Sequence, residues 1–167
     1  MNKIQKLQLA QQITGHTFKN PDWLWEALQA AGSDVSKLNG RTLPEGNRPL
    51  AGLGDLVIDL IIKSDCYNSN MSTGSTVTLL QTRVNNNRLA RLCGKSGLAE
   101  CINLNPSQSL ATPILCAATV EAVVGAVYQD TSGNLANVRD VMSKMGIIDW
   151  AGSSSSATTS SSSSSSS

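Results

Sequence analysis

Two acidic residues lie one helical turn apart in an otherwise apolar stretch of this chain. The stretch reads LAGLGDLVIDLIIK and spans residues 50–63, with Asp55 near its start and Asp59 four residues later. A spacing of four places both carboxylates on one face of a helix. Removing a carboxylate from water is costly unless a partner or a metal ion compensates. The sequence therefore raises the question of what Asp55 pairs with.

Zinc chemistry is not indicated by the remaining residues that commonly bind metals. The four cysteines, Cys66, Cys93, Cys101 and Cys116, contain no C-x-x-C pair, and His16 is the single histidine. This pattern argues against a Cys/His zinc site. Cysteines in apolar surroundings are typical of reduced core residues, which favours an intracellular protein.

Length and charge limit the classes of protein that fit. A chain of 167 residues is about one domain long. Its net charge of +1 lacks the basic excess of proteins that bind nucleic acid tightly on their own. The N-terminus lacks the apolar segment of a signal peptide, and no apolar run reaches the length that crosses a bilayer, so we expect no membrane partner.

Hydrophobic periodicity predicts helices and no strand pattern. Asn20 and Pro21 are typical of a helix start and Gly32 of its end, while Thr112 and Pro113 begin a second clear helix. We expect an all-α domain over residues 1–150, followed by a disordered serine-rich tail over 151–167. The expected helices cover residues 2–14, 20–32, 50–63, one or two segments within 75–92, 114–128, and a final segment from 135 to 145. Gly15 is expected to end the first helix, and a bend is possible at residues 85–87. The helix at 50–63 is apolar on most sides, so we expect it to be buried.

Four segments in order resemble the endonuclease domain of the ribonuclease III family. They are GHTFKNPDWLWEAL, NRPLAGLGDLVIDLII, TGSTVTLLQTRVNNNRLARLCGKSGL and AATVEAVVGAVYQD. The second is similar to the family's N-E-R-L-E-F-L-G-D-A-V-L helix, and the fourth to its closing A-D-x-x-E-A-x-x-G-A-x-Y-x-D motif. The resemblance implies the family's all-α helical bundle, a homodimer, and double-stranded or structured RNA as partner.

The resemblance also implies which residues take part in catalysis. The family places two carboxylates on each of two helices, where they bind Mg²⁺ that polarises a phosphodiester and activates water. Asp55 and Glu121 match two of these catalytic and metal-binding positions. Ala51 and Ala118 stand where the other two carboxylates are expected. Mg²⁺ or Mn²⁺ is therefore the implied cofactor if the domain is active.

Simpler roles compete with these assignments. Asp55 could cap a helix that begins at Leu56 or accept backbone hydrogen bonds, and Glu121 could pair with a basic residue. Asp59 and Glu45 are weak substitutes for the missing ligands.

Several other residues also allow either a structural or a functional interpretation. The Arg88–Lys95 segment presents Arg88, Arg91 and Lys95 on one helical face, which suits either solvent or phosphates. At least one of Trp23 and Trp25 belongs to the core, and His16 fills a position where the family has an aromatic residue.

Three functions remain open from the sequence. The first is a weakly active or inactive ribonuclease III-like domain that works in RNA processing or RNA–protein assembly. The second is an active Mg²⁺-dependent endonuclease that cleaves double-stranded RNA. The third is a protein–protein dimerisation module that does not bind RNA, which is favoured by the near-neutral charge and by the absence of room for a double-stranded-RNA-binding domain after Gly146.

Overall fold

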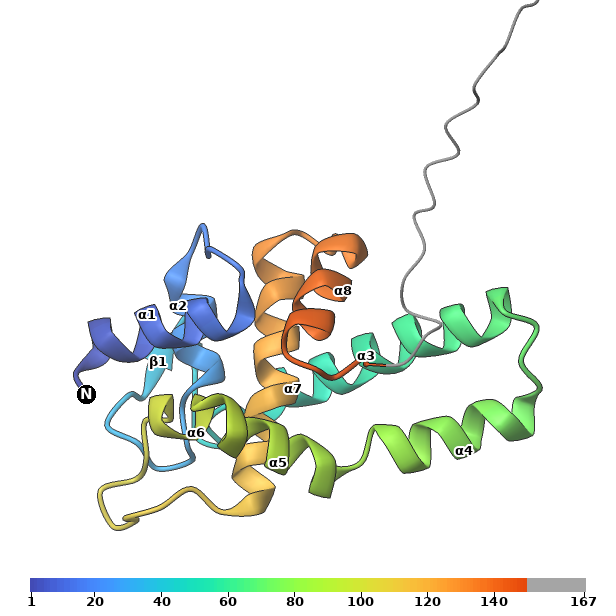
Figure 1. Cartoon of the computed structure of the whole chain (residues 1–167). Coiled ribbons are helices and arrows are strands. Elements are labelled where there is room, and N and C mark those ends of the chain that lie inside the picture. Colours follow the sequence, from blue (N-terminus) through green and yellow to red (C-terminus); the bar gives the residue numbers. More distant parts are fainter. Residues whose placement is uncertain (150–167) are drawn as a thin grey trace, which may run out of the picture.

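The structure, a computed structural model, describes residues 1–149, and within this range its regular secondary structure is almost entirely helical (Figure 1). The predicted all-α class is confirmed, whereas the predicted tail at 151–167 lies outside the described residues. The elements are α1 (Lys3–Thr14), α2 (Pro21–Ala27), β1 (Lys37–Leu38), β2 (Arg41–Thr42), α3 (Arg48–Asn68), α4 (Thr73–Arg83), α5 (Asn86–Ser96), α6 (Leu98–Cys101), α7 (Pro113–Asp130) and α8 (Leu135–Lys144).

Helix α7 forms the centre of the bundle. It packs against α2, α3, α5 and α8, and Figure 1 shows it crossing between the N-terminal helices and α8. Its sequence is dominated by Ala and Val, and most of its residues from Cys116 to Val127 are buried. Thr112 caps its start by accepting a hydrogen bond from the Leu115 N–H, as the sequence predicts.

A close backbone contact joins α3 to α7 at two glycines. A Cβ atom added to Gly54 would lie 1.8 Å from the Glu121 carbonyl oxygen, and one added to Gly125 would lie 2.6 Å from the Leu50 carbonyl oxygen. Both distances are far below van der Waals contact, so only glycine permits the two backbones to approach this closely. This crossing fixes the position of α3 on the central helix.

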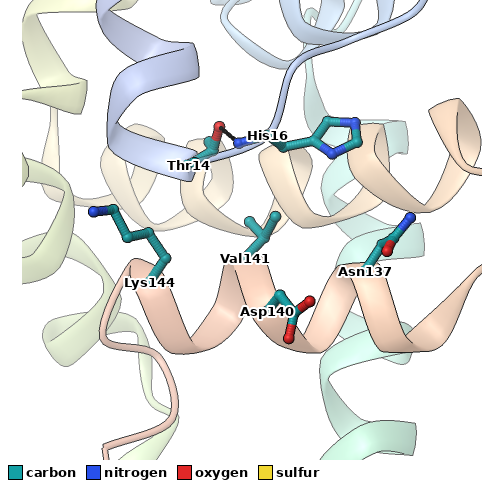
Figure 2. Close-up of a pocket in the computed structure, with 7 residues that line it drawn as sticks. Thr14, His16, Asn137, Asp140, Val141 and Lys144 are labelled. Atoms are coloured by element: carbon teal, nitrogen blue, oxygen red, sulfur yellow. Dashed lines mark hydrogen bonds between the residues drawn. The ribbon is translucent and has the colours of Figure 1, made fainter.

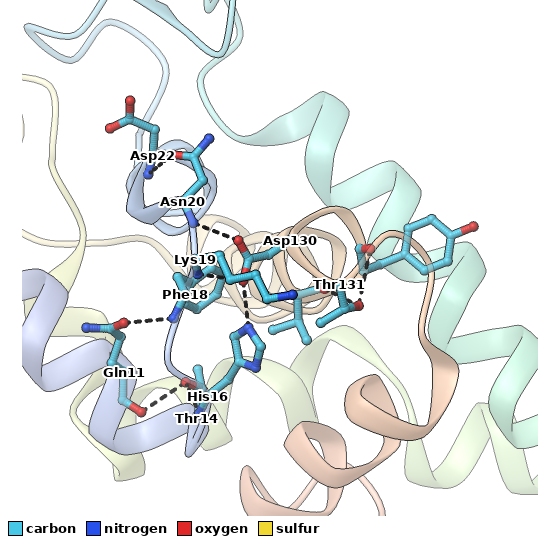
Figure 3. A network of polar contacts seen from close by, with 11 residues as sticks. Gln11, Thr14, His16, Phe18, Lys19, Asn20, Asp22, Asp130 and Thr131 are labelled. Carbon is cyan, nitrogen blue, oxygen red and sulfur yellow. Dashed lines mark hydrogen bonds and ion pairs between the residues drawn. The ribbon is translucent and has the colours of Figure 1, made fainter.

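A buried carboxylate ties the connection between α1 and α2 to the end of α7 (Figure 3). Asp130 accepts hydrogen bonds from the Lys19 and Asn20 N–H groups at 3.0 and 2.9 Å and from His16 Nε2 at 2.9 Å. Burial alone would raise the pKa of Asp130, but these hydrogen bonds together lower it. His16 also packs edge-on against Phe18, with ring centroids 4.7 Å apart, so it fills the aromatic position expected of it and adds the hydrogen bond to Asp130.

Several predicted boundaries are confirmed. Gly15 ends α1 in the left-handed conformation, and the Asn20 side chain caps α2. The predicted bend near residues 85–87 separates α4 from α5, where Asn85 caps the second helix. Trp25 belongs to the core, which confirms the prediction for the tryptophan pair.

Other boundaries differ from the prediction. Helix α2 ends at Ala27 rather than at Gly32, because the chain leaves the helix to form a short parallel bridge between Gln29 and Asn103. The loop at 33–49 contains a two-residue antiparallel hairpin, β1–β2, which is too short to show an alternating pattern in the sequence.

Helix α3 is less buried than its composition predicts. Its second half and α4 project from the bundle as an arm (Figure 1), and α4 contains no buried residue. Leu56, Leu60 and Tyr67 on α3 are 68%, 50% and 82% exposed. The predicted burial on most sides is therefore wrong, since one face of α3 packs on α7 and the other remains open. None of the helices formed by residues 1–149 is both long and apolar enough to span a membrane.

The glycine crossing generates a direct prediction. Replacing Gly54 with Ala should lower the free energy of unfolding by about 3 kcal/mol or more, because the added methyl group forces α3 away from α7. Gly52→Ala in the same helix is the matched control, since a Cβ there meets nothing within 4 Å. The control should be stabilised by roughly 0.5–1 kcal/mol. Chemical denaturation of both variants measures the difference, and equal stability of the two would contradict the crossing.

Candidate carboxylate site on α3 and α7

The crossing of α3 and α7 brings together the two acidic residues singled out from the sequence. Gly54 approaches the backbone of Glu121 directly, and Asp55 is the next residue of α3. The negative charge of Asp55 acts on the Glu121 carboxyl, which shows that the two side chains share one electrostatic environment. The pairing predicted from two segments 66 positions apart in the sequence is therefore present in the fold.

Both carboxyl groups hold their protons more tightly than free ones. Burial, followed by repulsion from Asp55, raises the pKa of Glu121 to about 7. Partial burial, followed by repulsion from Asp59, raises the pKa of Asp55 as well, although Asp55 lies at the exposed side of α3. At neutral pH the proton on Glu121 competes with any cation that the pair could hold.

The donor set does not match a resident Mg²⁺ site of four carboxylates. Ala51 is 4% exposed and lies in the core, and Ala118 is half-buried, so neither position supplies an oxygen. Residues 1–149 contain no group of three or more His, Cys, Asp or Glu side chains that could hold a metal ion. Two carboxylates leave a Mg²⁺ ion dependent on water and on substrate oxygens for its remaining ligands.

The weak substitutes considered from the sequence have other surroundings. Asp59 forms an ion pair with Lys63 at 3.2 Å, one turn along α3, so it reaches the site only through its charge. Glu45 is exposed in the turn before α3.

The simpler roles proposed for the two carboxylates are also wrong. Helix α3 begins at Arg48, so Asp55 lies in its interior and cannot cap a helix start at Leu56. Within the described part of the chain, no basic side chain lies within 4.0 Å of Glu121 to form an ion pair.

Arg88 has a structural role that neither sequence interpretation anticipated. Its side chain is only 15% exposed, and its guanidinium donates to the carbonyls of Arg83, Gly146 and Ile147 and to the Asp149 carboxylate. It is therefore neither a solvated residue nor free to bind phosphate. Arg91 and Lys95 remain exposed on α5 as the rest of the predicted basic face.

Three further polar contacts were missed from the sequence. The Asn47 amide is buried and donates to the Ala27 carbonyl and to Thr119 Oγ1, which joins the start of α3 to α2 and α7. Glu26 is buried beside Asn39 of the hairpin. Asp65 pairs with Arg139 of α8. An asparagine directly before a helix that begins with Arg-Pro was the one available signal, and it suggests a cap rather than a buried bridge.

A pocket of about 490 Å³ lies between the end of α1 and α8, and it contains neither site carboxylate (Figure 2). His16 and Thr14 line one side, while Asn137, Asp140 and Lys144 line the other. Its titratable lining residues are the acidic Asp140 and the basic His16 and Lys144, and neither Asp55 nor Glu121 is among them, so the pocket is separate from the carboxylate site.

Comparison with known proteins agrees with this geometry. The family model described as Ribonuclease III domain matches residues 48–132, which include both α3 and α7. The chain is 29% identical over 150 residues to Ribonuclease 3 of Proteus mirabilis strain HI4320, covering 86% of this chain and 61% of that protein. It is 35% identical over 123 residues to Ribonuclease 3 of Bdellovibrio bacteriovorus, covering 70% and 51%. The chain thus spans about half to three fifths of the length of these relatives.

Solved structures share the fold. Two solved structures of the nuclease domain of ribonuclease III from Campylobacter jejuni are similar to this chain, each with a TM-score of 0.67. They are 21% and 22% identical to this chain, and the matches cover 84% and 89% of this chain and 97% and 100% of those domains. One of the two is described as showing flexibility in a region involved in dimer formation.

The raised pKa of Glu121 predicts how stability depends on pH. Because the pKa in the folded chain, about 7, lies above the ordinary value of 4.5, the folded state loses stability as pH rises between these values, and the full penalty applies above pH 7. Glu121→Gln should remove this dependence and raise the free energy of unfolding at pH 8 by on the order of 1–2 kcal/mol, with little change at pH 4. Glu45→Gln in the exposed turn is the control. Denaturation at pH 4, 6 and 8 measures the effect, and parallel pH profiles for wild type and Glu121→Gln would exclude it.

Proposed function

Since this chain belongs to the ribonuclease III family, we propose that it acts in RNA processing or RNA–protein assembly and cleaves RNA weakly or not at all. The observation that carries the proposal is the pair of alanines at the carboxylate site. Of the family's four metal-binding carboxylate positions, Ala51 and Ala118 occupy two and leave acidic side chains only at Asp55 and Glu121. The remaining catalytic and metal-binding residues of the proposal are therefore Asp55 and Glu121.

Low metal affinity is the physical basis of the weak activity. Four carboxylates supply the negative charge that holds a divalent metal ion against RNA phosphates. Two carboxylates supply at most half of that charge. The raised pKa of Glu121 reduces this charge further at neutral pH. If metal binds, Asp55 and Glu121 would hold Mg²⁺ or Mn²⁺, which would supply the polarisation of the phosphodiester.

A homodimer that binds double-stranded or structured RNA fits the same proposal. Leu56, Leu60 and Tyr67 expose apolar surface along α3, and Val77 on α4 is 46% exposed. An exposed apolar stripe on a projecting arm is favourable only where a second surface covers it. A second copy that contributes its own arm would cover the stripe symmetrically. The exposed Arg91 and Lys95 offer phosphate contacts, and the four free cysteines fit an intracellular setting.

The two alternatives make different predictions. An active endonuclease would cleave double-stranded RNA in Mg²⁺ despite the missing ligands. A dimerisation module without RNA binding would be dimeric by sedimentation and would show no shift of double-stranded RNA at low salt. The net charge of +1 supports the dimerisation module only mildly, because a local basic patch can bind RNA on a chain whose total charge is near zero.

The decisive experiment is incubation of the purified chain with long double-stranded RNA in Mg²⁺ and, separately, in Mn²⁺. We expect cleavage at least about a thousandfold slower than that of an intact family member used as positive control, since each lost metal ligand typically costs orders of magnitude. A gel-shift assay of the same RNA in EDTA tests binding separately from cleavage. Robust cleavage that Asp55→Asn abolishes would refute the weak-activity proposal.

Restoring the missing carboxylates provides the converse test. The double variant Ala51→Glu and Ala118→Asp should bind divalent metal more tightly than wild type. It should also be less stable without metal, because Ala51 lies in the core and like charges repel. Added Mg²⁺ or Mn²⁺ should therefore raise its Tm by several degrees more than that of wild type, as expected when a ligand binds only the folded state. The single variants are the controls, and Ala51→Glu should cost more stability than Ala118→Asp. Equal metal responses of wild type and double variant would show that the positions do not form one site.

A further inference from the structure

The hairpin β1–β2 turns at Asn39 and Gly40, the single Asn-Gly pair in this chain. Leu38 pairs with Arg41, so the turn consists of these two residues alone, with φ values of 50° and 75°. Two positive φ angles are typical of a type I′ turn, which favours Asn-Gly. A side chain added at Gly40 would meet nothing within 4 Å, so the turn is open to water.

The side chain of Asn39 holds this turn against α2. Its Nδ2 group donates to Glu26 Oε2 at 2.8 Å and to the Asp22 carbonyl at 3.3 Å, and its Oδ1 accepts from Asn20 Nδ2 at 3.3 Å. Glu26 is only 1% exposed. Its Oε1 lies 3.8 Å from Nη1 of Arg41, whose side chain is 46% exposed. The Asn39 amide therefore makes the shorter of these two contacts to a buried carboxylate.

We propose that Asn39 is a deamidation site, and that its reaction turns the group that donates to Glu26 into a second carboxylate and releases the hairpin from α2. Asparagine followed by glycine is especially prone to this reaction, because glycine has no side chain to hinder its backbone nitrogen. The modification is spontaneous and needs only water. This inference does not depend on the proposed function in RNA processing.

The reaction proceeds in two steps that balance with one water molecule. The backbone nitrogen of Gly40 loses its proton to base and attacks Asn39 Cγ, the bond from Cγ to Nδ2 breaks, and ammonia leaves with that proton. Water then opens the resulting cyclic imide. Cleavage between Cγ and the Gly40 nitrogen gives aspartate, whereas cleavage at the main-chain carbonyl of residue 39 gives isoaspartate. One water is consumed and one ammonia is released in either case.

Neither product can keep the contact to Glu26. Aspartate has no N–H group to donate, so Glu26 would stay buried beside a second negative charge, with Arg41 as the nearby cation. Leaving a buried charged group without its donor costs more than the hydrogen bond itself, and the like charges add to this cost. Isoaspartate also lengthens the main chain, which a two-residue turn cannot accommodate while Leu38 stays paired with Arg41.

The hairpin can open while the core stays packed. Its four strand residues, Lys37, Leu38, Arg41 and Thr42, are exposed or half-buried. Segments with few buried contacts open locally far more often than the whole domain unfolds. The hydrogen bonds of Asn39 restrain its amide, so the reaction in the folded chain takes place when the hairpin opens.

The test incubates the folded full chain at pH 9, where base promotes the attack, and follows the conversion of amide to acid by mass spectrometry. A protease that cleaves after glutamate releases residues 27–45, in which Asn39 is the only asparagine. We expect Asn39 to react several-fold faster than any other asparagine of the folded chain, and faster still in the denatured chain. First reaction elsewhere, such as at exposed Asn68, would overturn the proposal. No detectable reaction at Asn39 in the folded chain after the denatured chain has fully converted would do the same.

Variants test the consequence for stability. Asn39→Asp should lower the Tm by several degrees, whereas Asn68→Asp at the exposed end of α3 should change it little. Glu26→Gln should lessen the effect of Asn39→Asp, because the glutamine amide can donate to the new carboxylate, and a double-mutant cycle measures this coupling.

Aged wild type gives the same information if a variant fails to fold. Its converted and unconverted fractions differ by one charge, so they can be separated and their Tm values compared. We expect a lower Tm for the converted fraction. Equal Tm values of the two fractions, or additive effects of the substitutions at positions 26 and 39, would refute the proposed link to Glu26.

Discussion

The contact between the backbones of Gly54 and Gly125 is the constraint on which the rest of the fold depends. A methyl group at either position would overlap a carbonyl oxygen of the opposite helix, so α3 and α7 can cross at this distance only with glycine at both. The crossing buries the valine and alanine side chains of α7 and leaves the opposite face of α3 in solvent. It also determines where Asp55 and Glu121 lie, since each is within four residues of a glycine in the contact.

Proximity and chemistry are therefore separate properties of this site. The glycine crossing brings the two carboxylates together whether or not a metal binds, because it depends on backbone packing alone. The chemistry depends on the neighbouring positions 51 and 118, where alanine provides packing in place of an oxygen ligand. This separation explains how a site can keep its geometry and its raised pKa values while it lacks half of its expected ligands.

The sequence predicted the helices well where local signals act alone. Caps at Asn20 and Thr112 and the stop at Gly15 depend on neighbouring residues, and all three are confirmed. The errors involve contacts between distant segments. The end of α2 depends on Asn103, the burial of Arg88 depends on the carbonyls of residues 146 and 147, and the exposure of Leu56 depends on which face of α3 meets α7. For the carboxylate site, the resemblance to the ribonuclease III family predicted the pairing, but no local pattern indicates that Glu121 lacks a basic partner within residues 1–149.

The hydrogen bonds of Arg88 have a practical meaning for anyone who shortens this protein. A shorter version that stops before Gly146 would keep every helix of the bundle, because α8 ends at Lys144. It would nevertheless remove three acceptors of the Arg88 guanidinium, the carbonyls of Gly146 and Ile147 and the Asp149 carboxylate, together with the segment that helps to bury it. These hydrogen bonds to a charged group join α5 to the segment after α8, so a fragment that keeps them extends through residue 149.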